Sequence, residues 1–118
     1  ASYNMANSFY KSGLNMEAVN EYKSSILKAK NKEDLHKSYH NLGDVYMQNK
    51  DYQNAVTSFK KALLNNPSDD ETRYNYVFVR IEYKYSFINF NKPEKPWTYV
   101  HDFNKKNNHC NELQLKLF

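Results

Sequence analysis

Residues 36–69 read HKSYHNLGDVYMQNKDYQNAVTSFKKALLNNPSD, and this stretch decides the fold. Two sets of residues within it recur at spacings of three and four, which place each set along one face of a helix. The first set is Tyr39, Leu42, Gly43 and Tyr46, and the second is Ala55, Phe59, Ala62 and Leu63. Asp51 is suited to cap the second helix and Pro67 to end it. The stretch therefore predicts two antiparallel helices joined by a turn at residues 49–51.

Small residues stand where these two helices would meet. A glycine inside a helix costs about 1 kcal/mol relative to alanine, so Gly43 needs a packing reason. The whole pattern resembles the tetratricopeptide repeat (TPR), with Tyr39 replacing the frequent tryptophan. This resemblance covers residues 2–90 and implies a protein-binding scaffold rather than a catalyst. A narrower resemblance, to small TPR proteins of bacterial aerotolerance (Bat) operons, rests on the long first unit and on the phrase NPSDDETRYNY at residues 66–76.

Copies of the pattern flank the central repeat. Ala18 and Tyr22 stand 37 positions before Ala55 and Phe59, with Gly13 in the turn before them. Because the usual period is about 34 residues, the first unit's second helix is expected to run on through Lys30. Downstream, residues 68–71 have the Ser-x-x-Glu form of a capping box, which opens one long terminal helix rather than a full third repeat.

These observations predict an all-α fold in which antiparallel helix pairs stack into a short TPR superhelix of about 2.5 repeats. The expected helices cover residues 2–12, 15–30, 33–48, 52–65 and 69–90. The TPR domain spans residues 1–90, as units 1–35 and 36–68 followed by the terminal helix 69–90. The tail, residues 91–118, matches no pattern and is expected either to pack back or to be partly disordered.

Function is expected on the concave face, which the first helix of each pair lines in stacked repeats. Asn4, Asn41 and Asn75 occupy equivalent places in the three units, and this ladder resembles that of the O-GlcNAc transferase superhelix. An amide can both donate and accept, which suits an extended peptide backbone. The alternative is coincidence, because 17 of the 118 residues are Asn. The other candidates on this face are Asn7, His40, Asp44, Gln48 and Tyr74.

The TPR clamp that holds acidic C-termini of chaperones uses two asparagines and several cations. Asn7 and Asn41 match the asparagines, and Lys37 is the one cation that remains. Tyr3, Glu71 and Asn75 replace the others. A ligand carboxylate would be repelled by Glu71. The sequence therefore argues against a chaperone co-receptor.

An aromatic region follows the central repeat. Residues 69–103 hold 10 of the 19 aromatic side chains, and these occupy more than one helical face, so something must cover them. The cover is either the tail or a partner, which includes a second copy in a homodimer. The candidate residues for self-association or partner contact are Tyr83, Tyr85, Phe87, Phe90 and Trp97.

Charge leaves one further alternative. The net charge is +4, but the basic residues are almost all lysines spread along the chain, which only weakly favours nucleic-acid binding. No catalytic constellation, phosphate loop or cofactor motif is present, so we expect neither an enzyme nor a bound cofactor. His36 and His40 share a helical face, but no third ligand completes a metal site, so both are expected at the surface or in the groove.

The sequence contains no run of about 18 apolar residues, which argues against a transmembrane segment. Ala1 falls inside the first repeat unit, so the chain is expected to follow a removed leader or to be an excised fragment. The expected protein is soluble, either cytoplasmic or, if a leader was removed, periplasmic.

Overall fold

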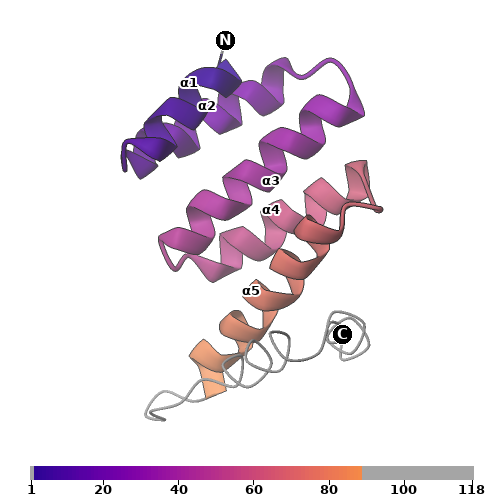
Figure 1. The fold of residues 1–118 in the computed structure, drawn as a ribbon. Helices are drawn as coiled ribbons and strands as arrows, with labels where there is room; N and C mark the ends of the chain where they lie inside the picture. The colour runs from indigo at the N-terminus through magenta and orange to yellow at the C-terminus, as the bar shows by residue number, and fades with distance from the viewer. Residues whose placement is uncertain (1, 89–118) are drawn as a thin grey trace.

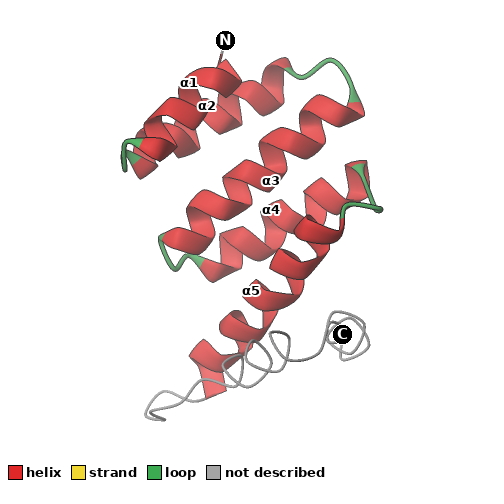
Figure 2. Cartoon of the chain, in the orientation of Figure 1, coloured by secondary structure: helices red, strands yellow, loops and turns green. Residues whose placement is uncertain are grey.

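The computed structural model describes residues 2–88, which form five helices (Figure 1). They are α1 (Ser2–Lys11), α2 (Asn15–Lys28), α3 (Lys32–Gln48), α4 (Tyr52–Asn65) and α5 (Asp70–Ile88). The described part of the chain contains loops and no strand (Figure 2), which confirms the all-α prediction. Most predicted helix ends agree within one residue. The predicted tail, Phe90 and Trp97 lie outside the described residues.

The helices stack in chain order. Each helix packs on its neighbours in sequence, so that α1 contacts α2, α2 contacts α3, α3 contacts α4 and α4 contacts α5. Figure 1 shows α3 between the α1–α2 pair and the α4–α5 pair. The fold is therefore a short helical array in which each core forms between consecutive helices.

Two hydrophobic clusters hold the array together. The first joins α1, α2 and α3, and the second joins α4 and α5. Tyr46 packs against both clusters, which makes the core continuous along α3. Phe59 of α4 is fully buried, and a buried phenylalanine contributes about 1.5–3 kcal/mol relative to an exposed one. The fully buried members of the first cluster are Ala6, Ala18, Tyr22 and Val45, and those of the second are Ala55, Phe59 and Val79.

Gly43 marks the contact between α3 and α4. A Cβ atom placed on Gly43 would lie 2.6 Å from the Cε1 atom of Phe59, closer than real side chains approach. The ring therefore occupies the space that any other residue would need, which confirms the packing reason predicted for this glycine. Gly13 lies in the α1–α2 turn at φ +78°, a left-handed conformation that favours glycine.

Helix boundaries show one confirmed cap and two corrections. Asp51 caps α4, as predicted, by accepting a hydrogen bond from the backbone N–H of Asn54 at 3.3 Å. The prediction that α2 runs through Lys30 is wrong, because Ala29 is extended and α2 ends at Lys28. Residues 29–31 instead form the connection that leads to α3.

The predicted capping box at Ser68 is also wrong. The side chain of Ser68 turns back to donate to the Oδ1 atom of Asn66 at 2.8 Å. Asp69 caps α5 instead, and its Oδ1 atom accepts from the backbone N–H groups of Glu71 at 3.1 Å and Thr72 at 3.5 Å. This shift by one residue leaves the second carboxylate oxygen of Asp69 to face α3.

Candidate functional site

Polar side chains connect α1 to α3. The Nδ2 group of Asn41 donates to the hydroxyl of Tyr3 at 2.8 Å and to Oδ1 of Asn7 at 3.2 Å. The same oxygen of Asn7 accepts from the hydroxyl of Tyr22. Burial, reinforced by nearby Tyr3, raises the pKa of Tyr22 well above its usual value, so the hydroxyl keeps its proton. Asn41 is thus held by two donated bonds, and its side chain also interacts with the Tyr22 hydroxyl.

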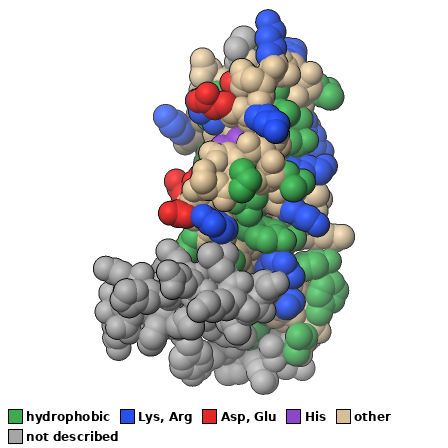
Figure 3. Space-filling view, turned by 90° about the vertical axis from the view of Figure 1, so that its right-hand side faces the viewer, with side chains coloured by type: hydrophobic (Ala, Val, Ile, Leu, Met, Phe, Trp, Pro, Cys, Tyr) green, Lys and Arg blue, Asp and Glu red, His purple; other side chains and the backbone are tan. Residues whose placement is uncertain are grey.

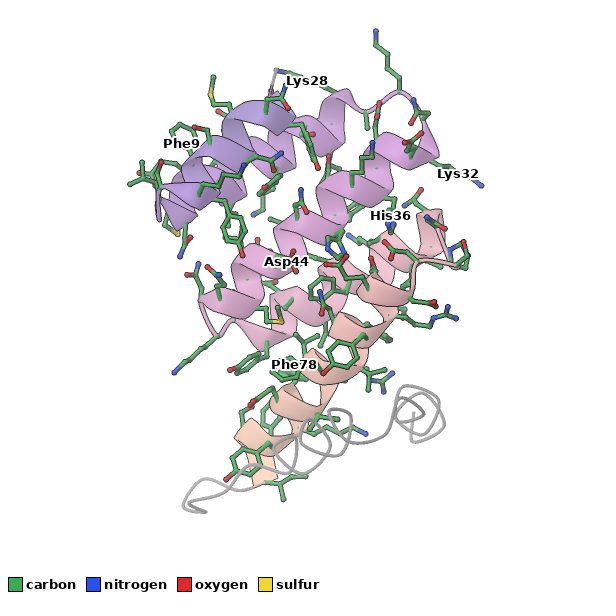
Figure 4. All side chains as sticks on the ribbon, in the orientation of Figure 1. Phe9, Lys28, Lys32, His36, Asp44 and Phe78 are labelled. Carbon is green, nitrogen blue, oxygen red and sulfur yellow. The ribbon has the colours of Figure 1, made fainter. Side chains whose placement is uncertain are left out.

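A second polar network connects α3 to the start of α5. Nδ1 of His40 lies 2.6 Å from the hydroxyl of Thr72, which donates to Oδ2 of Asp69 at 2.9 Å. Nε2 of His36 lies 2.7 Å from the same Oδ2 atom, and Nδ1 of His36 lies 2.8 Å from the carbonyl oxygen of Ala62. Figure 4 shows His36 on α3 beside the start of α5. Both histidines therefore converge on the Asp69 carboxylate.

The partners of these rings determine which atoms donate. Because a carbonyl and a carboxylate only accept, His36 satisfies both bonds when each ring nitrogen carries a hydrogen. Burial disfavours the ionised form of Asp69, but hydrogen bonds from His36 and Thr72 outweigh burial and lower the pKa of Asp69. The network is therefore built around an ionised carboxylate.

His40 is balanced by opposing effects. Burial lowers its pKa, but the hydrogen bond to Asp44 and the charges of Asp44, Glu71 and Asp69 outweigh burial and raise the pKa above its usual value. Nε2 of His40 lies 3.3 Å from Oδ2 of Asp44, and Asn75 donates to the other oxygen of Asp44 at 3.3 Å. Asp44 therefore contacts His40 within α3 through one oxygen and joins α3 to α5 through the other.

A pocket of about 540 Å³ lies beside these networks, within the range typical of ligand sites. We call it the α3–α5 pocket. Its entrance carries Lys37, which pairs with Glu33 at 3.1 Å, and Glu71, whose side chain is 76% exposed. The pocket is lined by Tyr3, Glu33, His36, Lys37, His40, Asn41, Asn65, Asn66, Asp69 and Glu71.

The predicted groove residues divide into three sets. His40 and Asn41 line the α3–α5 pocket, and Asn7, Asp44 and Asn75 belong to the networks beside it. Asn4 and Gln48 are exposed, and Tyr74 is half-buried. Within the ladder, Asn41 bonds to Asn7 of α1, which lies one turn beyond Asn4.

Sequence reasoning did not include Asp69 among the groove residues. For His36 the expectation was the surface or the groove, and the surface alternative is wrong, because His36 is 7% exposed and lines the α3–α5 pocket. The i, i+4 spacing of His36 and His40 and the acidic residue at the start of α5 were the available signals. His36 and Asp69 are 33 residues apart in the sequence, and the spacing of residues along one helix does not reveal a contact between them.

A second hollow, of about 650 Å³, lies between α4 and α5, and we call it the α4–α5 groove. The sequence spreads lysines along the chain, but the fold gathers four cations here from two helices. Figure 3 shows one side of the molecule, where hydrophobic side chains are interspersed with Lys and Arg along the right-hand edge. The groove is lined by Val56, Thr57, Lys60, Lys61, Leu64, Tyr76, Arg80, Tyr83, Lys84 and Phe87.

The aromatic end of α5 differs from its prediction at one residue. Phe87 is 71% exposed, and its ring stacks edge-on against Tyr83 at 4.9 Å between centroids. Tyr85 was expected at the self-association surface but is only 8% exposed. Its spacing of three from Glu82 and eight from Val77, which are both buried, places it on the inward face of α5.

Two further properties concern the described residues alone. Among residues 2–88, no three His, Cys, Asp or Glu side chains are grouped so that they could hold a metal ion. None of the five helices is both long and apolar enough to cross a membrane.

Comparison with known protein families identifies a match for the central repeat. The model of the tetratricopeptide repeat family matches residues 36–69, which comprise α3 from His36 onward, α4 and the connection to α5. A search of curated proteins finds no match to the chain. The matched stretch contains Gly43 and Phe59, whose contact joins α3 to α4. Residues 36–69 thus match the tetratricopeptide repeat family, within an all-α, TPR-like helical repeat fold.

Proposed function

We propose that this protein is an interaction scaffold that captures an extended peptide segment in the α3–α5 pocket. The observation that carries the proposal is the fixed amide of Asn41. Its two donated bonds, to Tyr3 and Asn7, orient the amide, and its Oδ1 atom would accept from the bound segment. An oriented acceptor beside a hollow suits a backbone N–H group of an extended peptide, because little conformational entropy is lost on binding.

The neighbouring residues would extend such a site along the array. Asn7, Asp44 and Asn75 are already linked across helices, so they would give the bound segment a rigid wall. Asn4, Gln48 and Tyr74 would contact the segment where it leaves the pocket. The acidic C-terminus of a chaperone fits poorly, because Lys37 is engaged by Glu33.

The proposal also includes an absence of catalysis. The hydrogen-bond partners of His36, His40 and Asp69 within the chain account for their positions without a reaction. The resemblance of residues 66–76 to Bat-operon TPR proteins is in keeping with a scaffold that holds a partner in an assembly.

Asn41→Ala tests the proposal. Peptides are selected from a random library displayed on phage, and the affinity of the best peptide is measured by calorimetry for wild type and variants. Losing one well-made hydrogen bond is expected to weaken binding by about tenfold. Asn20→Ala is the control, because Asn20 is exposed on α2 and does not line the pocket. Equal loss in both variants, with helicity unchanged by circular dichroism, would contradict peptide capture in this pocket.

A second candidate function is self-association through the end of α5. Phe87 and Ile88 are 71% and 73% exposed, and Phe87 lines the α4–α5 groove. Two such side chains in contact across a dimer would lose their exposure to water. Sedimentation over a concentration series should then show a mass that rises with concentration. Phe87→Ser should prevent the rise, whereas Leu27→Ser on α2, where Leu27 is 87% exposed, should not. A monomer at every concentration would remove this candidate.

A third candidate, weak nucleic-acid binding, gains support from the cations of the α4–α5 groove. Lys60, Lys61 and Lys84 stand there beside aromatic rings on which bases can stack. Binding of labelled single-stranded RNA or DNA should weaken steeply as salt rises. No binding at low salt would remove the candidate.

A further inference from the structure

Glu71 stands apart from the other charged side chains of the α3–α5 pocket. Its Oε1 atom lies 3.8 Å from Nε2 of His40, and its side chain is 76% exposed. The other charges around the pocket have closer partners: Lys37 and Glu33 at 3.1 Å, His36 and Asp69 at 2.7 Å, and His40 and Asp44 at 3.3 Å. Among residues 2–88, Glu71 is therefore the pocket carboxylate whose charge is least satisfied.

The position of Glu71 directs that charge toward a ligand. It lies in the first turn of α5, at one side of the pocket, whereas Asn41 lines the pocket from α3. The pocket thus offers two acceptors from different helices, the amide oxygen of Asn41 and the Glu71 carboxylate. A cation that enters between them gains a charged hydrogen bond, and an anion meets repulsion.

We propose, resting on the function above, that the segment captured in this pocket carries a lysine or arginine whose cationic group pairs with the Glu71 carboxylate. The segment belongs to another protein, and its backbone is held at Asn41. Arginine is the better fit of the two, because its planar guanidinium can donate two parallel bonds to one carboxylate. The pocket is thereby selective for basic peptides, although the chain itself carries a net charge of +4.

Asp70 provides a matched control. It precedes Glu71 in the same turn, but its carboxylate pairs with Arg73 at 2.6 Å and does not line the pocket. Glu71→Gln and Asp70→Asn each remove one negative charge from the start of α5. A general effect of charge on binding would therefore appear equally in both variants.

The test has two stages and uses the full 118-residue chain. A random peptide library is first selected on wild type, Glu71→Gln and Asp70→Asn, and the lysine and arginine content of the recovered peptides is compared. Wild type and Asp70→Asn should enrich basic residues, and Glu71→Gln should not. Calorimetry of the best wild-type peptide should then show about fivefold weaker binding to Glu71→Gln, with Asp70→Asn within about twofold of wild type.

Replacing the basic residue of that peptide by glutamine, in combination with Glu71→Gln, completes a double-mutant cycle. It should weaken binding to wild type by about fivefold, and it should have little effect on binding to Glu71→Gln, because the pair is already broken. A repeat at high salt should reduce the wild-type advantage. Additive losses in the two changes would overturn the proposed pair.

The outcomes separate this inference from the proposed function. Peptides that depend on Asn41 but show neither basic enrichment nor sensitivity to Glu71 would overturn the inference and leave peptide capture intact. Binding that is indifferent to Asn41→Ala would overturn both. Enrichment of acidic peptides would overturn the inference, because acidic peptides would bind the cations of the α4–α5 groove. If the tightest ligands matched basic segments of this chain, the partner would be a second copy of the chain rather than another protein.

Discussion

The α3–α5 pocket and the α4–α5 groove use different sides of α5 and differ in how their polar side chains are held. In the pocket, buried and partly buried hydrogen bonds fix the histidines and Asn41 in place. In the groove, Lys60, Lys61 and Lys84 are exposed, and none of its lining residues is acidic. The pocket is thus organised before a ligand arrives, whereas the groove offers charge on long, flexible side chains.

Because of this difference, substitutions at the two surfaces of α5 should have different effects on folding. Substitutions in the pocket should change the stability of the fold together with ligand binding, because the same bonds join α3 to α5. Substitutions in the groove should change binding or association with little effect on stability, since surface charges contribute little to folding.

Phe59→Ala should break both surfaces at once. Phe59 is fully buried, and its ring centroid lies 5.7 Å from that of His40. Removing the ring therefore leaves a cavity between α3 and α4, beneath the pocket. We expect a loss of about 4 kcal/mol in the free energy of unfolding, measured by urea denaturation. Leu64→Ala, at a site that is 71% exposed, is the control and should cost far less. A small effect of Phe59→Ala would show that α3 and α4 are held by other contacts.

Asp69→Ala should weaken the pocket and leave the groove intact, because Asp69 lines only the pocket. It removes the cap of α5 and leaves Nε2 of His36 without its acceptor, for a combined cost of about 2 kcal/mol. Because the pKa of folded Asp69 is lowered, its contribution is present above the usual aspartate pKa and is lost as pH falls through the folded pKa. Urea denaturation below about pH 4 should therefore show wild type losing its advantage over the variant. A constant difference at every pH would contradict the charged network.

Gly43→Ala tests the spacing on which both surfaces depend. An added Cβ meets the Phe59 ring at 2.6 Å, and overpacking of about 2 kcal/mol should exceed the gain of about 1 kcal/mol in helix propensity. The net loss is expected to be about 1 kcal/mol in thermal or urea unfolding. In a Phe59→Leu background the same change should become neutral or stabilising. Destabilisation that persists there would place the clash elsewhere.

His40 should make stability depend on pH near neutrality. Its raised pKa means that the folded chain binds the proton more tightly, so the contribution is complete below the usual histidine pKa of about 6.5 and is lost as pH rises through the folded pKa. His40→Gln should flatten the decline in unfolding free energy between about pH 6 and 8. The groups that face His40 are Asp44 on its own helix, and Glu71 and Asp69 at the start of α5. An unchanged decline in the variant would assign it to another group.

Lys61→Met should have the smallest effect. Lys61 lines the groove and lies 5.7 Å from the centre of the Tyr39 ring, a contact worth about 0.5 kcal/mol when exposed. Unfolding should shift by no more than that, whereas binding of any anionic ligand in the groove should weaken. A large loss of stability would show that the groove is as rigidly organised as the pocket.

The helical array could be read from local pattern. The spacings around Leu42 and Phe59 set two helices, Asp51 set a cap, and Gly43 indicated a close contact, because each signal lies within one or two turns of chain. Errors occurred at the ends of elements. Lys30 lies beyond α2, and Asp69 rather than Ser68 caps α5, since neighbouring polar residues compete for the same backbone groups.

The candidate site was only partly predictable. Asn41 and His40 were expected on one face of the helix over residues 33–48, and both line the α3–α5 pocket, because a shared face follows from the register of one helix. The convergence of His36 and Asp69 was missed because their contact depends on how the α4–α5 connection folds back over α3. Tyr85 was misplaced for a related reason, since composition identifies an aromatic region but only packing decides which ring is buried.

The sequence by itself determined that this chain forms stacked helix pairs with a TPR pattern at residues 36–69, because periodicity and glycine placement act locally. The tertiary structure alone decided which polar groups meet. It joined His36 to Asp69, left Glu71 3.8 Å from His40 and gathered scattered lysines into one groove. Charge and hydrogen bonding act through space, and distances between helices exist only once the array has packed.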